Sequence, residues 1–273
     1  MSVRTKLFHR GLRVDQWLAA SPLLRRSSGR AKTVFFPGCS LAGYNPSYVF
    51  AARDFIRGHE GECGVFMACC AKPLKLIGER TLFQRRIDLL RRRLDDMGAE
   101  TVVTACQNCF KILRTHDKGR NVVSLWPLML ERGLPAGREG RFSGMEASLQ
   151  DSCAMGAYPK IGAAARDLLK RLGVTVREME FSGSRAKCCG GITMITTGDA
   201  RIGREAMRTR AAESPCSTIL SYCASCRSAM SVDGSHISLH LLDLIFGNDE
   251  PSRKGSNLLN RWRTARFAGH AGT

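Results

Sequence analysis

The sequence predicts an α/β fold made of two pseudo-symmetric repeats of parallel-sheet βαβ units that pack together. Two observations support this prediction. Short apolar segments alternate with helical patterns of ten or more residues, an order that is typical of parallel sheets. Ten of the twelve cysteines also fall into two groups with one shared pattern, which indicates an internal duplication.

The first repeat contains three expected strands, at residues 33–36, 65–67 and 101–104. A helix is expected between the first two, from Pro46 to about Arg57. The clearest helix of the chain precedes the third strand, because its apolar residues recur every three or four positions. These residues are Phe83, Ile87, Leu90, Leu94 and Met97.

The second repeat follows the same order. Strands are expected at residues 149–152, 174–176 and 217–220, and helices at residues 161–172 and 199–212. In parallel sheets of this kind, ligands bind in the crevice beyond the carboxyl ends of the strands. The expected site of each repeat is therefore at that edge of its sheet.

Composition excludes several classes of protein. The chain has 273 residues, of which 44% are hydrophobic and 24% charged, as in ordinary soluble domains. It has no run of 18 apolar residues and no apolar segment after its basic N-terminus, so we expect neither a transmembrane helix nor a secretory signal. The formal charge of +18 would suit nucleic acid, but no nucleic-acid motif accompanies it. We expect a cytoplasmic protein that does not bind nucleic acid.

The cysteines are the most informative feature. Each group consists of a single cysteine, a vicinal pair and a C-x-x-C motif, and equivalent members lie 114 to 119 residues apart. The first group is Cys39, Cys69, Cys70, Cys106 and Cys109, and the second is Cys153, Cys188, Cys189, Cys223 and Cys226. The repeat extends beyond them, because Ser124-Leu125 matches Ser238-Leu239 at an offset of 114. Cys63 and Cys216 lie outside both groups and are expected to be buried apolar thiols.

Every grouped cysteine follows an expected strand and precedes a helix, whose N-terminal dipole favours a thiolate. Each group can thus converge from three loops. Four types of chemistry compete for it: disulfides, a structural zinc site, a thioredoxin-like redox pair and iron–sulfur ligation. Disulfides suit small secreted domains, zinc takes four ligands, and a redox pair would leave three cysteines of each group unexplained. Iron–sulfur ligation by thiolates is the favoured interpretation.

Four cations adjoin the motifs: Lys72, Lys111, Lys187 and Arg227. Positive charge beside a thiolate-ligated cluster would tune its potential. The competing explanation is that a chain with 42 basic residues places some of them beside any motif.

The duplicated pattern, with Cys188-Cys189-Gly190-Gly191 in the second repeat, resembles the cysteine-rich CCG-domain iron–sulfur proteins. That family includes the disulfide-cleaving component of heterodisulfide reductase and iron–sulfur subunits of glycolate, lactate and glycerol-3-phosphate oxidation. The resemblance covers about residues 33 to 246 and implies one noncubane [4Fe-4S] cluster per group of five. One departure from the pattern is Ala71, which stands where the second repeat has Gly190. Since alanine resists the backbone conformation that glycine allows, the first site is the less certain of the two.

By that resemblance the chain is the redox subunit of an oxidoreductase and reduces a disulfide-type substrate, as heterodisulfide reductase does. Neither a G-x-G-x-x-G motif nor a P-loop is present, so we expect no flavin or NAD site on this chain. Its electrons would come from a flavoprotein or ferredoxin-like partner subunit. An alternative is an electron relay from an organic-acid-oxidising flavoprotein to quinone, and another is a zinc-stabilised scaffold.

Four segments are expected along the chain. Residues 1–32 form a basic amphipathic extension, residues 33–140 the first repeat, residues 141–250 the second, and residues 251–273 a flexible basic tail. The extension is expected to have one apolar helix face, made of Leu7, Phe8, Leu12, Trp17 and Leu18. Three interpretations remain open for it: a peripheral contact with anionic lipid on the inner face of the membrane, a docking arm for an acidic partner, or a packed extension.

Overall fold

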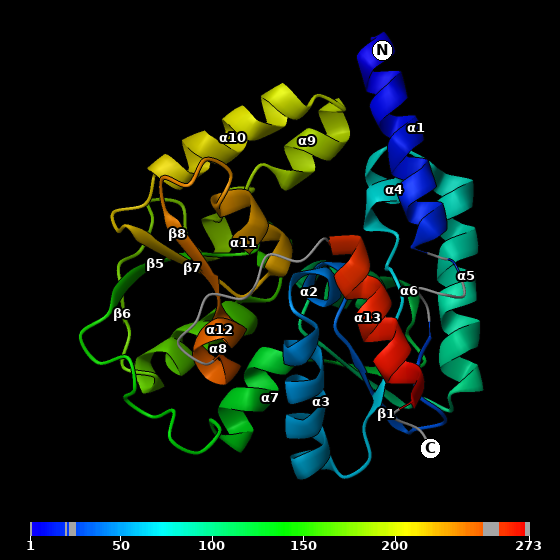
Figure 1. Cartoon of the computed structure of the whole chain (residues 1–273), viewed down its shortest axis with the longest axis horizontal. Helices are drawn as coiled ribbons and strands as arrows, with labels where there is room; N and C mark the ends of the chain where they lie inside the picture. The colour runs from blue at the N-terminus through cyan, green and yellow to red at the C-terminus, as the bar shows by residue number, and fades with distance from the viewer. Residues whose placement is uncertain (1, 20, 22–25, 248–256, 271–273) are drawn as a thin grey trace. The chain divides into compact units, whose positions relative to one another are not determined.

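The computed structural model describes residues 2–19, 21, 26–247 and 257–270. These residues form two compact units, one of residues 1–124 with 252–273 and the other of residues 125–251. Each unit contains a four-stranded, all-parallel sheet with helices between its strands (Figure 1). The predicted α/β class and the two repeats are confirmed.

The first unit has the strand order β2-β1-β3-β4. Its strands are β1 Thr33–Phe36, β2 Gly64–Val65, β3 Thr101–Thr104 and β4 Asn121–Ser124. Its helices are α1 Val3–Leu18, α2 Cys39–Tyr44, α3 Pro46–Glu60, α4 Lys72–Leu76, α5 Arg80–Asp96, α6 Gln107–His116 and α13 Asn257–His270. Strand β1 is central, and Val34, Phe35 and Phe36 are fully buried, as expected for a parallel strand covered on both faces.

The local sequence explains the helices that cover this sheet. Helix α3 begins where the Asn45 side chain accepts the Ser47 N–H and Pro46 occupies the first turn, a favourable start. Helix α5 buries Phe83, Ile87, Leu90 and Leu94 on one face, which confirms the predicted periodicity.

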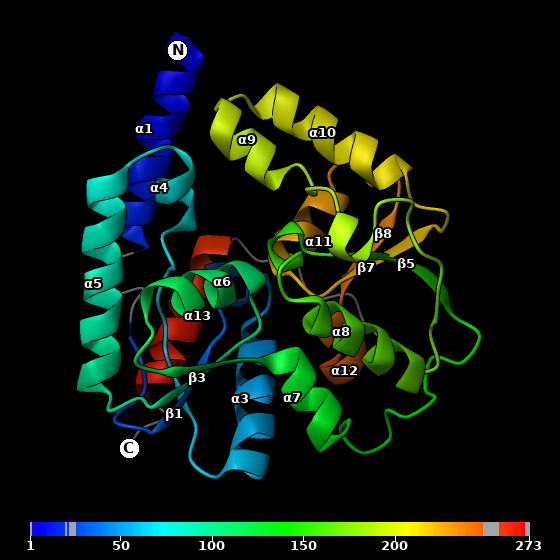
Figure 2. The same cartoon turned by 180° about the vertical axis from the view of Figure 1, so that it is seen from behind.

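The second unit repeats the topology, with the strand order β6-β5-β7-β8. Its strands are β5 Glu146–Gln150, β6 Thr175–Val176, β7 Thr218–Ser221 and β8 Ile237–His240. Its helices are α7 Leu125–Arg132, α8 Pro159–Arg171, α9 Gly191–Thr197, α10 Ala200–Ala212, α11 Ala224–Met230 and α12 Leu241–Phe246 (Figure 2). Two short 3-10 helices, η2 Cys153–Met155 and η3 Gly183–Arg185, complete it.

The structure corrects the alignment of the repeats past the cysteines. Ser124 pairs with Thr104 at the end of β4, and His240 pairs with Ser221 at the end of β8. Ser124 is therefore equivalent to His240, at an offset of 116, and not to Ser238. Strands β4 and β8 are themselves absent from the sequence prediction, because each is a short edge strand of four residues, two of which are polar.

The units do not divide where the sequence suggests. The division falls after residue 124, because α7 packs with the second unit: Trp126 is fully buried there, with ring centroids 6.3 Å from Tyr222 and 5.8 Å from His240. At the other end, residues 257–270 form helix α13 on the first unit in place of the expected flexible tail. Residues 251–256 and 271–273 of that segment lie outside the described part.

Helix α1 differs from the expected extension in the direction of its side chains. Phe8 and Leu12 are half-buried on the inner side, next to the buried His9 and Gln16, whereas Leu7, Trp17 and Leu18 are exposed. At about 100° per residue, the five apolar residues cannot share one face. None of the described helices is both long and apolar enough to cross a membrane.

Candidate functional site

The single cysteines and the C-x-x-C motifs lie directly beyond the strands. Cys39 is the first residue of α2, and Cys106 precedes α6 as its N-cap. In the second unit Cys153 begins η2, and Cys223 is the N-cap of α11. The last cysteine of each motif lies in the first turn of the helix that follows. These positions are at the carboxyl edge of each sheet, where parallel sheets bind ligands.

The vicinal pairs reach the same edge by different routes. Cys69 and Cys70 follow β2 after a short loop, whereas Cys188 and Cys189 follow β6 only after a longer loop that contains η3. Arg210, buried in α10, holds this loop: its guanidinium donates to the Phe181 carbonyl at 2.8 Å. The same guanidinium donates to Gln150 Oε1 at 2.7 Å.

The five thiols of the first unit form one continuous series of contacts. The Sγ atoms of Cys39 and Cys69 lie 3.9 Å apart. Cys69 interacts with Cys70, Cys70 with Cys109, and Cys109 with Cys106. Three loops that are far apart in the sequence thus bring all five predicted thiols together.

The second unit repeats the series member by member. Cys153 interacts with Cys188, Cys188 with Cys189, Cys189 with Cys226, and Cys226 with Cys223. All twelve cysteines lie in the described part of the chain, and none of them forms a disulfide. Cys63 is buried, as predicted, whereas Cys216 is half-buried, and both lie outside the two groups.

One thiol in each group is acidified by its neighbours. Contacts from Cys109 and Cys69 lower the pKa of Cys70 to about 6, in spite of its burial. Contacts from Cys153 and Cys189, together with backbone N–H groups, lower the pKa of Cys188. Each group therefore has one member for which the thiolate, the metal-binding form of cysteine, is favoured.

The backbone after the two vicinal pairs is left-handed. Ala71 has φ 54° and Gly190 has φ 88°, and Ala71 is the only non-glycine residue with positive φ in the described part of the chain. The two repeats therefore turn the chain in the same way, and only the second uses the residue suited to it. Gly38 is a second such position: a Cβ there would lie 3.1 Å from Cys109 Sγ.

The four predicted tuning cations do not behave alike. The Lys187 ammonium lies 3.0 Å from Glu213 Oε1 and 3.5 Å from the centroid of the Phe181 ring. Lys111 is exposed, whereas Lys72 and Arg227 are half-buried. Their effect on a cluster remains a prediction.

Sequence reasoning missed two side chains beside the first group. Arg261 of α13 donates from Nε to the Cys39 carbonyl at 3.1 Å. Contact with Cys69 and burial raise the pKa of Cys39, and the charge of Arg261 opposes this rise. Gln16 of α1 accepts the Cys69 thiol at 3.4 Å. Both arrive from segments outside the repeats, so no local motif could have revealed them.

The first members of the two vicinal pairs have different surroundings. Cys69 adjoins a cavity of about 20 Å³ lined by Gln16, Arg86 and Arg93, roughly enough for one water molecule. Cys188 adjoins a pocket of about 640 Å³, which is within the size range of small-molecule sites. A small molecule can therefore enter beside the second group, whereas α1 fills the corresponding position at the first.

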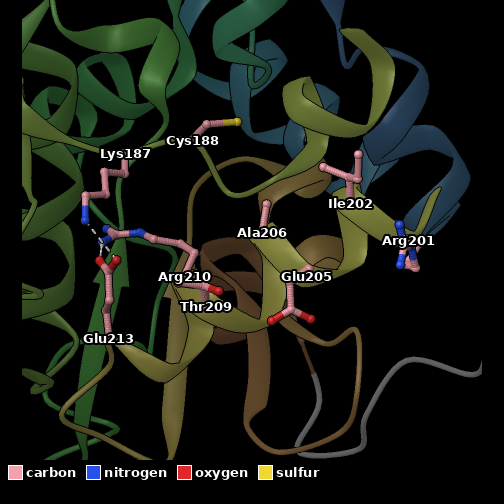
Figure 3. Close-up of a pocket in the computed structure, with 9 residues that line it drawn as sticks. All are labelled: Lys187, Cys188, Arg201, Ile202, Glu205, Ala206, Thr209, Arg210 and Glu213. Carbon is pink, nitrogen blue, oxygen red and sulfur yellow. Dashed lines mark hydrogen bonds and ion pairs between the residues drawn. The ribbon is translucent and has the colours of Figure 1, made fainter. Parts of the chain in front are cut away.

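Helix α10 forms one wall of the larger pocket (Figure 3). Lys187, next to Cys188, forms a linked set of charges with Arg210 and Glu213 at one end, Ala206 lies between, and Ile202 lies at the other end with Arg201 and Glu205. The pocket thus offers a thiol and a small apolar patch between two charged ends.

The thiols fit an iron–sulfur cluster by their donor chemistry. They are buried or half-buried and come from loops at one sheet edge, and a cluster accepts thiolates at several irons rather than at one point. Among the described residues, no three His, Cys, Asp or Glu side chains are placed to hold a single metal ion.

A model of the cysteine-rich domain, CCG, matches residues 33–114 and residues 147–231. The two segments make up more than half of the chain. The chain belongs to the CCG cysteine-rich domain family. Each CCG segment contains one complete group of five cysteines and lies within one compact unit.

Two curated relatives are similar to this CCG chain. An uncharacterised iron–sulfur protein of Methanocaldococcus jannaschii is 24% identical over 193 residues, which are 67% of this chain and 37% of the relative. A protein of Chromohalobacter salexigens named "Probable membrane-anchored ferredoxin" is 27% identical over 128 residues, which are 42% of this chain and 19% of that protein. The chain therefore spans less than two fifths of the length of either relative.

Among solved structures, the aspartate racemase of Picrophilus torridus aligns with 79% of this chain and over 91% of its own length. The sequence identity is 9% and the TM-score is 0.35. At that score the likeness carries no argument about function.

Proposed function

We propose that the chain is an iron–sulfur redox subunit of an oxidoreductase complex, with one [4Fe-4S] cluster, of the noncubane type, in each unit. The carrying observation is the series of five thiols that both units repeat in the same order. Two further facts support it: the chain belongs to the CCG family, and a relative is named as an iron–sulfur protein.

The ten grouped cysteines would hold the clusters, and a cluster bound there would supply one-electron transfer. The chain's own residues give that chemistry its setting. Ala71 and Gly190 turn the backbone so that adjacent cysteines can both face the site, and Gly38 lets the first loop approach Cys106 and Cys109.

For the substrate we propose a disulfide-type compound, R–S–S–R′. Two electrons from a partner subunit and two protons from solvent break its S–S bond and release two thiols. The pocket beside Cys188 supports this proposal, because a substrate must reach the site and the second unit offers room for it. Oxidoreductase activity would then belong to the complex of this chain with its electron donor.

A second candidate is a relay that passes electrons from an organic-acid-oxidising flavoprotein to quinone. The relative named as a membrane-anchored ferredoxin favours it. A relay to quinone would reduce no disulfide, and this difference separates the two candidates.

The first experiment is a metal analysis of protein purified without oxygen. About eight iron and eight acid-labile sulfide per chain are expected from two four-iron clusters. The Cys70→Ser and Cys189→Ser variants should each lose about half of the iron, each from a different unit. Zinc without sulfide, or iron that neither substitution lowers, would contradict the proposal.

A second experiment separates disulfide reduction from relay. Ala206→Trp fills the pocket beside Cys188, and Ala163→Trp on the exposed side of α8 is its matched control. If the chain reduces a disulfide, the first variant slows disulfide reduction by the partner complex at least tenfold, while the rate at which the partner reduces the clusters is unchanged. Equal rates for both variants would favour the relay.

A further inference from the structure

Helix α1 has two faces with different surroundings. Its inner face packs on the first unit through the buried His9 and Gln16 and lies beside α4. Figures 1 and 2 show its N-terminal end projecting past α4. The helix is capped, because the Ser2 side chain accepts the Thr5 N–H at 3.1 Å. It is therefore a folded, anchored helix whose outer face is open.

The outer face is a stripe of large apolar side chains, which we call the outer stripe. Val3 is 81% exposed, Leu7 69%, Val14 56%, Trp17 66% and Leu18 37%. At about 100° per residue, all five fall within an arc of about 100°. Single exposed apolar residues are ordinary, but a contiguous row of them marks an interaction surface.

The charges around the outer stripe are positive. Arg10 lies within it, Lys6 and Arg13 flank one side and Arg4 the other, by the same helical geometry. Asp15, the one carboxylate of α1, pairs with Arg261 of α13, and Glu79 pairs with the flanking Arg13. The outer face therefore combines apolar area with excess positive charge.

We propose that α1 lies on the surface of an anionic lipid bilayer, with the outer stripe inserted among the acyl chains and the flanking cations at the headgroups. This inference goes beyond electron transfer and holds for either candidate function. Trp17 suits the headgroup region because its ring is amphipathic. Arginine and lysine can extend from an apolar face to reach phosphates, so Arg10 is compatible with insertion.

The partner is a bilayer rather than an acidic protein because of the form of the surface. A straight apolar row flanked by cations along a whole helix matches a planar interface with anionic headgroups. The inner contacts stay in place in this arrangement, so Gln16 keeps its contact with Cys69 while the outer stripe is in lipid.

Vesicle sedimentation of the full chain tests this proposal. We expect binding to phosphatidylcholine vesicles that contain phosphatidylglycerol, much weaker binding to phosphatidylcholine alone, and release by high salt. Leu7→Ser should weaken binding about tenfold, whereas Ile237→Ser, at an apolar residue of the second unit that is also well exposed, should leave it unchanged.

Two variants that each remove one positive charge complete the test. Arg10→Gln should weaken binding about fivefold, and Arg92→Gln, on the exposed side of α5, should have no effect. If both arginine variants lose binding equally, the attraction comes from the net charge of the chain and the proposal fails.

Trp17 gives a direct readout. The other two tryptophans are Trp126, which is fully buried, and Trp262. In a Trp262→Phe background, anionic vesicles should shift the Trp17 emission to shorter wavelength, and brominated lipid should quench it. No shift, or binding to polyglutamate in place of vesicles, would overturn the proposal and indicate an acidic protein partner.

Discussion

Ala71 and Gly190 occupy equivalent positions with the same left-handed backbone. Ala71 can be replaced by glycine without a loss of stability, whereas Gly190 cannot be replaced by alanine. A left-handed conformation costs a non-glycine residue about 1–2 kcal/mol, and glycine costs about 0.5–1 kcal/mol in chain entropy. Ala71→Gly should therefore leave stability unchanged or raise it by up to about 1 kcal/mol.

The reverse substitution has a different outcome. A Cβ at Gly190 would lie 2.7 Å from both Met207 N and Met207 Cγ. Gly190→Ala should cost more than about 2 kcal/mol and lower the iron content of the second site. Urea unfolding and iron analysis of both variants check this pair, and equal effects would contradict the assigned conformations.

His240 makes stability depend on pH. Burial lowers its pKa from 6.5 to about 4, with the nearby Asp243 acting in the opposite direction. Between these two values the unfolded chain binds a proton that the folded chain does not, so stability falls as pH falls from about 6.5 to 4. The full loss is about 3 kcal/mol.

The control for this prediction is His240→Asn, which keeps a side-chain acceptor for the Leu242 N–H at the start of α12 and removes the titration. Urea midpoints measured between pH 7.5 and 5 should fall more for the unmodified chain than for the variant. Parallel curves would show that His240 is not the titrating group.

At the scale of elements, α9 and α10 pack through a glycine. A Cβ at Gly203 of α10 would lie 2.7 Å from Met194 Cγ and against its Cβ, so Gly203→Ala must push α9 away. Because α9 begins at Gly191, directly after Cys188-Cys189-Gly190, we expect a loss of about 1–3 kcal/mol and a weaker second site.

Gly58 in α3 is the matched control, because a Cβ there would contact nothing within 4 Å. Gly58→Ala should raise stability by up to about 1 kcal/mol, as alanine favours the helix. Thermal unfolding of the two variants should shift in opposite directions. Shifts of the same sign would show that α9 and α10 are not closely packed.

Elements with a strong local pattern could be predicted from the sequence. The apolar run of β1 and the periodic face of α5 fix those elements locally. Edge strands β4 and β8 lack such a pattern, because half of each is polar. The incorrect match of Ser124 with Ser238 has the same origin. A short run of identical residues aligned the two repeats, whereas the correct alignment depends on the register of β4 and β8 in their sheets.

The residues of the candidate site were also only partly predictable from the sequence. The spacing of the ten cysteines placed all of them at two sheet edges, since chain topology brings strand ends together. Gln16, Arg261 and Arg210 could not be found, because each reaches its site through tertiary packing from another element.

At the scale of the whole molecule, the first unit is built from both ends of the chain. Asn260 of α13 is buried and donates to the Gly43 carbonyl at 3.0 Å. Asn260→Ala leaves that carbonyl without this donor and should cost about 1–3 kcal/mol. The exposed Arg263→Ala on the same helix is the control.

The effect should be confined to one unit. We expect Asn260→Ala to lose iron from the first site and to retain it in the second. Iron content in a Cys189→Ser background reports on the first site, and iron content in a Cys70→Ser background reports on the second. Equal loss from both sites would show that α13 does not act on the first unit alone.

The position of α13 also sets an order of events during synthesis. The second unit is one continuous stretch of chain and can fold as soon as residue 251 leaves the ribosome, whereas the first unit, although made earlier, lacks its last helix until translation reaches the end of α13. The cysteines that emerge first therefore belong to the unit that closes last. For the proposed function, that interval would leave the first site open to cluster insertion before Arg261 reaches the Cys39 carbonyl.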